Sequence, residues 1–254
     1  MNLKLIALPR EHGAWGYVLE PLILGLLAAF SVKGLYLAFG ALLAFLAHQP
    51  VRIYFSAQQN TKKASLLFLL MYGIPAVLFF ALFIYKTNPL YFLPFTLAIV
   101  FMLIYLFMEL AGFGRKMVTH MIPPTAIDLI AVSIVLVSGW ELLETAAFLV
   151  LLSSRAHPTT FYVRAKLRRR EDKEYYKVLA VAVHLLSLCM ASLLVYLKIM
   201  PGLALIAVFL LFIRAVIGVY FNKTVMTPKQ IGIREFIYGA LFVFISAAGY
   251  HFQI

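Results

Sequence analysis

Long apolar runs alternate with short polar breaks along the entire chain. Within each run the hydrophobic residues are continuous, whereas the strands of a membrane barrel would alternate apolar and polar positions. Each run approaches the length of about 20 residues that an α-helix needs to cross a bilayer. Turn-forming residues fill the breaks, as at Lys33-Gly34 and Thr87-Asn88-Pro89. The pattern predicts nine transmembrane helices, at residues 15–31, 35–53, 65–85, 90–110, 125–140, 142–162, 176–197, 201–221 and 235–252.

The composition also indicates an integral membrane protein. Hydrophobic residues make up 64% of the chain and charged residues 13%, and the mean hydropathy is +0.96, which is too apolar for a soluble domain of 254 residues. No polar stretch is long enough to form a separate soluble domain. We therefore expect an all-α, polytopic fold in which residues 1–254 form a single transmembrane domain.

Positive charge is concentrated at alternate breaks. The net charge is +12, yet only Lys33, Lys86 and Lys198 fall on the outer side when the N-terminus is placed in the cytoplasm. Cytoplasmic loops retain Lys and Arg, so this pattern predicts a multi-pass protein of the cell inner (plasma) membrane with a cytoplasmic N-terminus and an external C-terminus. Because the charge is explained by orientation, membrane lipids are the expected partners and nucleic acid is not.

Two segments in the two halves of the chain resemble each other. The first is Ala47-His48-Gln49-Pro50 with Arg52, and the second is Arg155-Ala156-His157-Pro158 with Arg164. Each closes an apolar run where a basic loop begins. Since a charge at membrane depth costs about 2.5–3.5 kcal/mol, polar groups at paired positions indicate a site. The similarity predicts pseudo-repeated halves whose polar helix faces meet in one cytoplasm-facing pocket.

The chemistry of these residues favours an anionic ligand. Arginine pairs in two-pronged fashion with phosphate or carboxylate, histidine can give or take a proton, and hydroxyls can complete the hydrogen bonding. A further polar cluster precedes the first predicted helix. We expect the head group of an isoprenoid diphosphate or other anionic lipid to bind to Arg10, His12, His48, Arg52, Ser56, Arg155, His157, Thr160 and Arg164.

Several ionisable residues fall deeper inside the predicted spans. Glu20, Glu109, Asp128 and Arg214 each need a partner there, and an ion pair between an acid and an arginine is one role. The other role is that of a proton acceptor. His48 and His157 could alternatively ligate a haem iron, but the neighbouring arginines suit an anion better.

The single cysteine limits the chemistry further. Cys189 lies within an apolar run, so it predicts neither an intrachain disulfide nor a cysteine-ligated metal cluster. We expect no cofactor, no metal site and no identifiable catalytic residue.

The N-terminal motif carries a family resemblance. The segment Leu8-Pro9-Arg10-Glu11-His12-Gly13-Ala14-Trp15, followed by Glu20-Pro21 and Gly25, resembles the start of the YwiC-like family of bacterial membrane proteins. The resemblance covers most of the chain and implies a membrane protein without defining its activity.

A more distant resemblance is to the UbiA-type intramembrane prenyltransferases. That family has nine helices and two acidic motifs, which close the second and sixth helices and hold magnesium on a prenyl diphosphate. The segments from Arg52 to Gln58 and from Thr160 to Asp172 fall at the corresponding places. Arg52, Ser56 and Gln58 replace the first set of acids, so the usual magnesium site cannot be assembled. The resemblance therefore implies a UbiA-like bundle more than its catalysis.

Three functions remain open at this point. The first is a prenyltransferase-like enzyme whose arginines neutralise the diphosphate without magnesium. The second is a non-catalytic lipid-binding, quinone-binding or assembly protein with the same pocket. The third is an organic-anion transporter.

Overall fold

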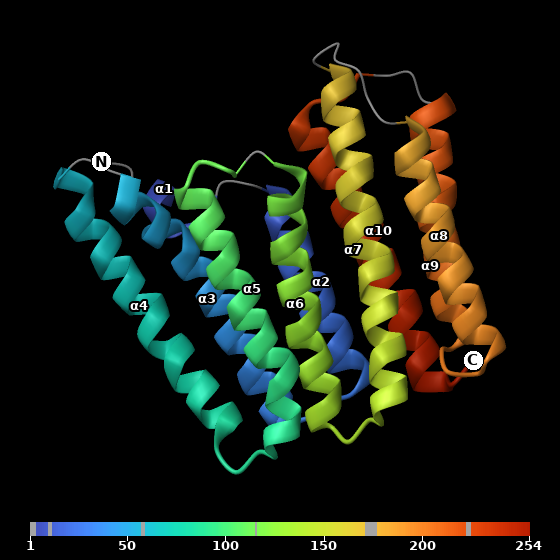
Figure 1. The fold of residues 1–254 in the computed structure, drawn as a ribbon, viewed down its shortest axis with the longest axis horizontal. Helices are drawn as coiled ribbons and strands as arrows, with labels where there is room; N and C mark the ends of the chain where they lie inside the picture. Colours follow the sequence, from blue (N-terminus) through green and yellow to red (C-terminus); the bar gives the residue numbers. More distant parts are fainter. Residues whose placement is uncertain (1–3, 10–11, 57–58, 115, 171–176, 222–224) are drawn as a thin grey trace.

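The chain folds into a bundle of long helices. The computed structural model describes residues 4–9, 12–56, 59–114, 116–170, 177–221 and 225–254, and within these ranges all regular elements are helical (Figure 1). This confirms the all-α prediction. The long helices are α2 (His12–Ala28), α3 (Val32–Ser56), α4 (Gln59–Ile84), α5 (Leu93–Leu110), α6 (Met117–Val137), α7 (Leu142–Arg170), α8 (Lys177–Tyr196), α9 (Gly202–Val216) and α10 (Pro228–Phe252).

Three short elements complete the fold. The helix α1 (Lys4–Ala7) precedes α2, a 3-10 turn, η1 (Pro89–Phe92), leads into α5, and a π-helical turn, η2 (Ile217–Phe221), extends α9. Asn88 caps η1, because its side-chain oxygen accepts a hydrogen bond from the backbone N–H of Leu90 at 3.0 Å. A capping box between Thr227 and Gln230 begins α10.

Seven of the described helical segments are long and apolar enough to cross a membrane. They are α3, α4, η1 with α5, α6, α8, α9 with η2, and α10. The other two predicted spans correspond to α2, which is a shorter apolar helix, and α7, which is more polar in composition. A multi-pass membrane protein is therefore supported. The polar residues of α2 and α7 contribute to the ionic network described below.

The predicted spans 90–110 and 125–140 leave Pro123-Pro124 in the break between them, and this placement is wrong. Both prolines lie inside α6, which begins at Met117. The helix continues because tertiary packing overrides the local cost of the two missing backbone donors. Most of α6 is buried against α2, α3, α5 and α7, and the Thr125 hydroxyl donates to the backbone carbonyl of Met121 at 2.9 Å.

Helices α2 and α6 join the two halves of the bundle. α2 packs against α3, α6 and α10, while α6 packs against α3, α5 and α7. In Figure 1 the two helices lie between the α3–α5 group and the α7–α10 group, and α1 lies at the opposite end of the bundle from the C-terminus. One apolar cluster is centred on α2, α3, α5 and α6, and a second on α6, α7, α9 and α10.

The outer surface is strongly apolar. Along α4 the side chains of Leu67, Ile74 and Val77 are exposed by 58%, 63% and 68%, respectively. A contiguous exposed surface of this kind is unfavourable in water and favourable against lipid tails.

Candidate functional site

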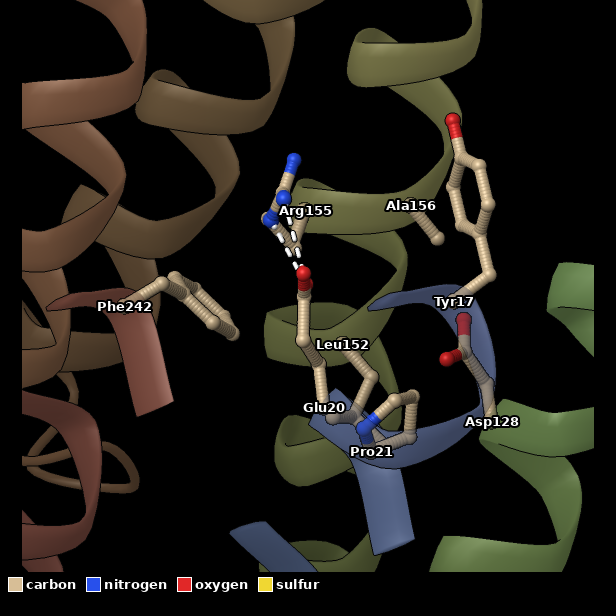
Figure 2. A pocket seen from close by; sticks show the side chains of 8 residues that line it. All are labelled: Tyr17, Glu20, Pro21, Asp128, Leu152, Arg155, Ala156 and Phe242. Carbon is tan, nitrogen blue, oxygen red and sulfur yellow. Dashed lines mark hydrogen bonds and ion pairs between the residues drawn. The ribbon is translucent and has the colours of Figure 1, made fainter. Parts of the chain in front are cut away.

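A buried ionic network lies where α2, α7 and α10 meet. Arg155 on α7 binds the Glu20 carboxylate on α2 with two prongs, Nε to Oε2 at 2.8 Å and Nη2 to Oε1 at 3.0 Å (Figure 2). The same guanidinium reaches α10, where Nη1 lies 3.4 Å from Glu235 Oε2 and Nη2 donates to the Glu235 carbonyl at 2.9 Å. Arg155, Glu20 and Glu235 are all buried. The Arg155 guanidinium therefore links α2, α7 and α10 through buried, charge-assisted hydrogen bonds.

A second arginine extends the network toward α8 and α9. Arg214 on α9 binds Glu235 through Nη1, and its Nη2 lies 3.0 Å from His184 Nε2 on α8. His184 Nδ1 lies 2.7 Å from the Ala180 carbonyl, so Nδ1 carries the hydrogen and Nε2 accepts from Arg214. This arrangement requires a neutral imidazole. The Arg214 guanidinium also packs 4.4 Å from the centre of the Tyr162 ring.

Glycines make room for this network. A Cβ atom added to Gly239 on α10 would overlap the Glu20 carboxylate, and one added to Gly16 on α2 would lie 2.9 Å from Glu20 Oε1. On α7, Thr159 follows Arg155 by four residues, so it shares the same helix face and accepts a hydrogen bond from Arg155 Nη1. The glycines let α2 and α10 approach closely at Glu20, and the spacing of four residues on α7 places Thr159 beside Arg155.

The network is electrically balanced. Glu20 and Glu235 contribute two negative charges, Arg155 and Arg214 contribute two positive charges, and His184 is neutral. Arg155 was predicted to neutralise an anionic ligand, but here its charge is matched by carboxylates of the same chain. The arrangement therefore offers no excess positive charge for a ligand at this depth.

A small cavity borders the network. Its volume is about 10 Å³, which is room for about one water molecule. Asp128 of α6 lines it together with Tyr17, Glu20 and Arg155, and Figure 2 shows its carboxylate near Tyr17 on the far side of Glu20 from Phe242. Asp128 is 0% exposed, and neither of its carboxylate oxygens has a hydrogen-bond partner among the described residues.

A separate cluster forms between α3 and α5. His48 Nε2 lies 2.8 Å from Glu109 Oε2, and Arg52 Nη1 lies 3.3 Å from Glu109 Oε1. The His48 ring also packs 5.4 Å from the ring of Tyr105. His48 and Arg52 are four residues apart, so they share one face of α3, and the Glu109 carboxylate pairs with both side chains.

Glu109 is the acid that holds this cluster. Replacing it with glutamine removes the charge that both cations face, and we expect a loss of about 1–2 kcal/mol in the free energy of unfolding, reduced by the partial exposure of Arg52. Thermal unfolding in detergent measures the change, with Glu144→Gln, at an exposed position near the start of α7, as the control. A Glu109→Gln variant as stable as Glu144→Gln would contradict the assigned pairing.

Arg164 lies near the N-terminal end of α6. Its Nη1 approaches the sulfur of Met117 at 3.4 Å, and Lys116, the residue before Met117, is exposed with its ammonium 4.2 Å from the Phe113 ring centre. Within the described residues, neither Arg164 nor Lys116 has a carboxylate partner. These two cations, Arg164 and Lys116, are called the basic pair below.

The sequence comparison identifies the family. The model of the YwiC-like protein family matches residues 8–135, which is half of the chain. The chain belongs to the YwiC-like family. No characterised protein and no solved structure matches it. The matched region of this YwiC-like chain ends within α6, so it contains Glu20, Glu109 and Asp128 but excludes Arg155 and Arg214.

The structure divides the predicted ligand-binding residues. His48 and Arg52 lie around Glu109, Arg155 lies around Glu20, and Thr160 exchanges a hydrogen bond with Tyr17 at 3.2 Å. His157 Nε2 lies 3.4 Å from Thr125 Oγ1 on α6, and α2 and α6 lie between the helices that carry the two histidines. No described contact joins the histidine–arginine segments of α3 and α7. Arg10 lies outside the described residues, as do the side chains of His12 and Ser56.

The network includes residues that the sequence analysis did not select. Glu235 was missed, although an acid at the first position of the predicted span 235–252 is itself a signal, because an isolated charge there needs a partner. Tyr17 and His184 lie within apolar runs, and nothing in the sequence around them indicates a charged partner. Among the described residues, no group of three His, Cys, Asp or Glu side chains is placed to hold a metal ion.

Proposed function

We propose that the protein binds the anionic head group of a membrane lipid at the end of the bundle where α6 begins and α7 ends. The ligand class is a phosphate or diphosphate lipid, which includes isoprenoid diphosphates. The observation that carries this proposal is the basic pair: Arg164 contacts Met117, the residue next to Lys116, and neither cation has a carboxylate partner in the described part of the chain.

The geometry suits a lipid head group better than a soluble anion. Arg164 is half-buried, so part of the desolvation cost of its charge is already met, while Lys116 is exposed. A guanidinium offers two parallel donors to a phosphate, and an ammonium adds a point charge. Basic residues at a membrane surface attract anionic lipids by about 1 kcal/mol each. The lipid chain would extend along the apolar helices.

The proposed binding site lies on the cytoplasmic face of the inner membrane. The sequence places most of its Lys and Arg at this end of the spans, which supports a cytoplasmic N-terminus by the positive-inside rule. Accessibility of a cysteine introduced at Lys63 in intact cells tests the orientation, since the only native cysteine is Cys189. Labelling of that cysteine by an impermeant reagent from outside would contradict it.

Binding to the basic pair can be measured by native mass spectrometry. The protein in mild detergent is titrated with phosphatidylglycerol, with farnesyl diphosphate and with zwitterionic phosphatidylcholine. We expect both anionic probes to bind more tightly than phosphatidylcholine. The Arg164→Ala substitution should weaken their binding about tenfold or more, because a charge-assisted hydrogen bond contributes about 1.5–3 kcal/mol. Lys116→Ala should have a smaller effect.

The control is Lys63→Ala, which removes an exposed cation from α4 at the same end of the bundle. If Lys63→Ala weakens binding as much as Arg164→Ala, the attraction is a general effect of surface charge and the proposed site is wrong. If only farnesyl diphosphate binds, the ligand is an isoprenoid diphosphate. If only phosphatidylglycerol binds, it is a structural lipid.

Prenyl transfer is the catalytic form of the same proposal. It is supported by the placement of the two polar segments at the ends of the second and sixth spans, as in UbiA-type enzymes, and by a proposed nine-span bundle with similar halves. The cations would neutralise the diphosphate leaving group directly. Release of diphosphate from farnesyl diphosphate in the presence of a chelator tests this form. Binding without release would support a lipid-binding protein, and flux of a labelled anion into proteoliposomes would support a transporter.

A further inference from the structure

The water-sized cavity beside Asp128 is not explained by lipid binding at the basic pair. It is lined by residues of α2, α6, α7 and α10, and its polar lining comes from Tyr17, Glu20, Asp128 and Arg155. Tyr17 has a hydrogen-bond partner in Thr160, and Glu20 and Arg155 form an ion pair. Asp128 is fully buried, and neither of its oxygens has a hydrogen-bond partner in the part of the chain that the structure describes. A buried carboxyl without a partner is costly, so its retention in a cavity that admits water indicates a bound species.

Charge balance identifies that species. The two arginines of the network already neutralise the two glutamates. An ionised Asp128 would therefore add one uncompensated negative charge in the interior of the bundle. A single proton or one monovalent cation would cancel it. A sodium ion needs several oxygen ligands, whereas this cavity admits about one water molecule, so a proton fits better.

The groups that face Asp128 are consistent with proton exchange. α2 contributes Tyr17 and Glu20, α7 contributes Arg155, and Glu235 of α10 lies beyond Arg155. His48 and Arg52 of α3 are paired with Glu109 of α5 and are separate from the cavity. Among the described residues, no cation is therefore available to pair with Asp128 unless Arg155 leaves Glu20.

A polar approach leads to Asp128 from the N-terminal end of α6. Thr125 lies one turn before Asp128 on the same helix face, and it contacts His157 Nε2 of α7 at 3.4 Å. His157 Nδ1 is buried and has no described partner. On the same side, the Tyr17 and Thr160 hydroxyls exchange a hydrogen bond. Histidine and hydroxyl groups can pass protons, unlike the apolar residues elsewhere in the bundle.

We propose that Asp128 is a proton-binding site, which takes up and releases one proton through a water molecule held in this cavity. In the protonated state the cluster is neutral and Arg155 remains bound to Glu20. On release, the proton passes from the Asp128 carboxyl to the water and onward toward His157, and the cluster gains one negative charge. The site is distinct from the basic pair, and its test does not depend on lipid binding.

Infrared difference spectroscopy of the protein in lipid nanodiscs tests this site. Spectra are compared between acidic and alkaline buffer, in H2O and in D2O. We expect a carbonyl stretch of a protonated carboxyl group that appears on acidification and shifts to lower frequency in D2O. Asp128→Asn should remove this band, because asparagine resembles the protonated carboxyl in shape and charge without titrating. Glu144→Gln, at an exposed carboxylate, should retain it.

Three results would overturn the proposal. A band that persists in Asp128→Asn belongs to another residue. A band that neither changes with pH nor shifts in D2O shows a sealed, permanently protonated carboxyl. A band that disappears when sodium chloride replaces potassium chloride at constant pH shows a sodium site. The thermal unfolding temperature of Asp128→Asn, measured alongside, should equal or exceed that of the wild type, which confirms that the variant is folded.

Discussion

Replacing Arg155 with glutamine is expected to destabilise the protein by about 3–5 kcal/mol, because it leaves buried carboxylates without their cation. Glu20 would lose both prongs of its ion pair, and Glu235 would retain only Arg214. Chemical unfolding in detergent, followed by tryptophan fluorescence, measures the loss. The effect should be larger than that of Glu109→Gln, because Arg155 is buried and contacts carboxylates on two other helices.

The charge-balanced double variant distinguishes electrostatics from lost packing. Combining Arg155→Gln with Glu20→Gln removes one charge of each sign, so the double variant should be more stable than Arg155→Gln alone. Lys63→Ala, which removes an exposed cation, serves as the control and should stay within about 0.5 kcal/mol of the wild type. If Arg155→Gln is itself that close to the wild type, the ionic network does not stabilise the bundle.

A single methyl group at Gly239 is expected to cost about 2–4 kcal/mol. Its Cβ would overlap the carboxylate of Glu20, which cannot withdraw without giving up its contacts with Arg155. Elsewhere in a helix, Gly→Ala is favourable by about 1 kcal/mol, so the sign of the effect is itself informative. The midpoint of thermal unfolding provides the measurement.

Gly73→Ala is the matched control for this substitution. Gly73 lies inside α4, where an added Cβ would have only Leu69 within contact distance, at 4.0 Å. This variant should be neutral or slightly stabilised. In a Glu20→Ala background the cost of Gly239→Ala should largely disappear, because the clashing carboxylate is gone. An equal cost in both backgrounds would mean that the methyl group clashes with something other than Glu20.

The helices could be predicted from the sequence because membrane spans leave a strong local signal. Each long described helix overlaps one predicted apolar run, and most turns occur at the predicted glycine, proline and asparagine clusters. The start of α6 was misplaced because prolines are weak helix breakers where neighbouring helices stabilise the backbone. The shared face of His48 and Arg52 also followed from spacing alone.

The partners of the polar residues could not be predicted in the same way. Spacing places Arg155 on a helix face, but it does not reveal that Glu20 approaches it from 135 residues away. The two similar segments suggested one shared pocket, whereas the intervening α2 and α6 separate α3 from α7. An ion pair with an arginine was one of the two roles considered for Glu20, and the contact with Arg155 confirms that role. The same two roles, an ion pair and a proton acceptor, were considered for Asp128. It has no ion-pair partner in the described residues.

The chain order of the buried charges has a consequence for biogenesis. Glu20 enters the membrane with the first long helix, Arg155 and Arg214 follow with α7 and α9, and Glu235 arrives only with α10. During synthesis, Glu20 is therefore the only one of the two paired carboxylates available to Arg155 and Arg214 until α10 is inserted. A nascent protein that stops before α10 would leave Arg214 without Glu235, and an unpaired arginine at membrane depth is costly.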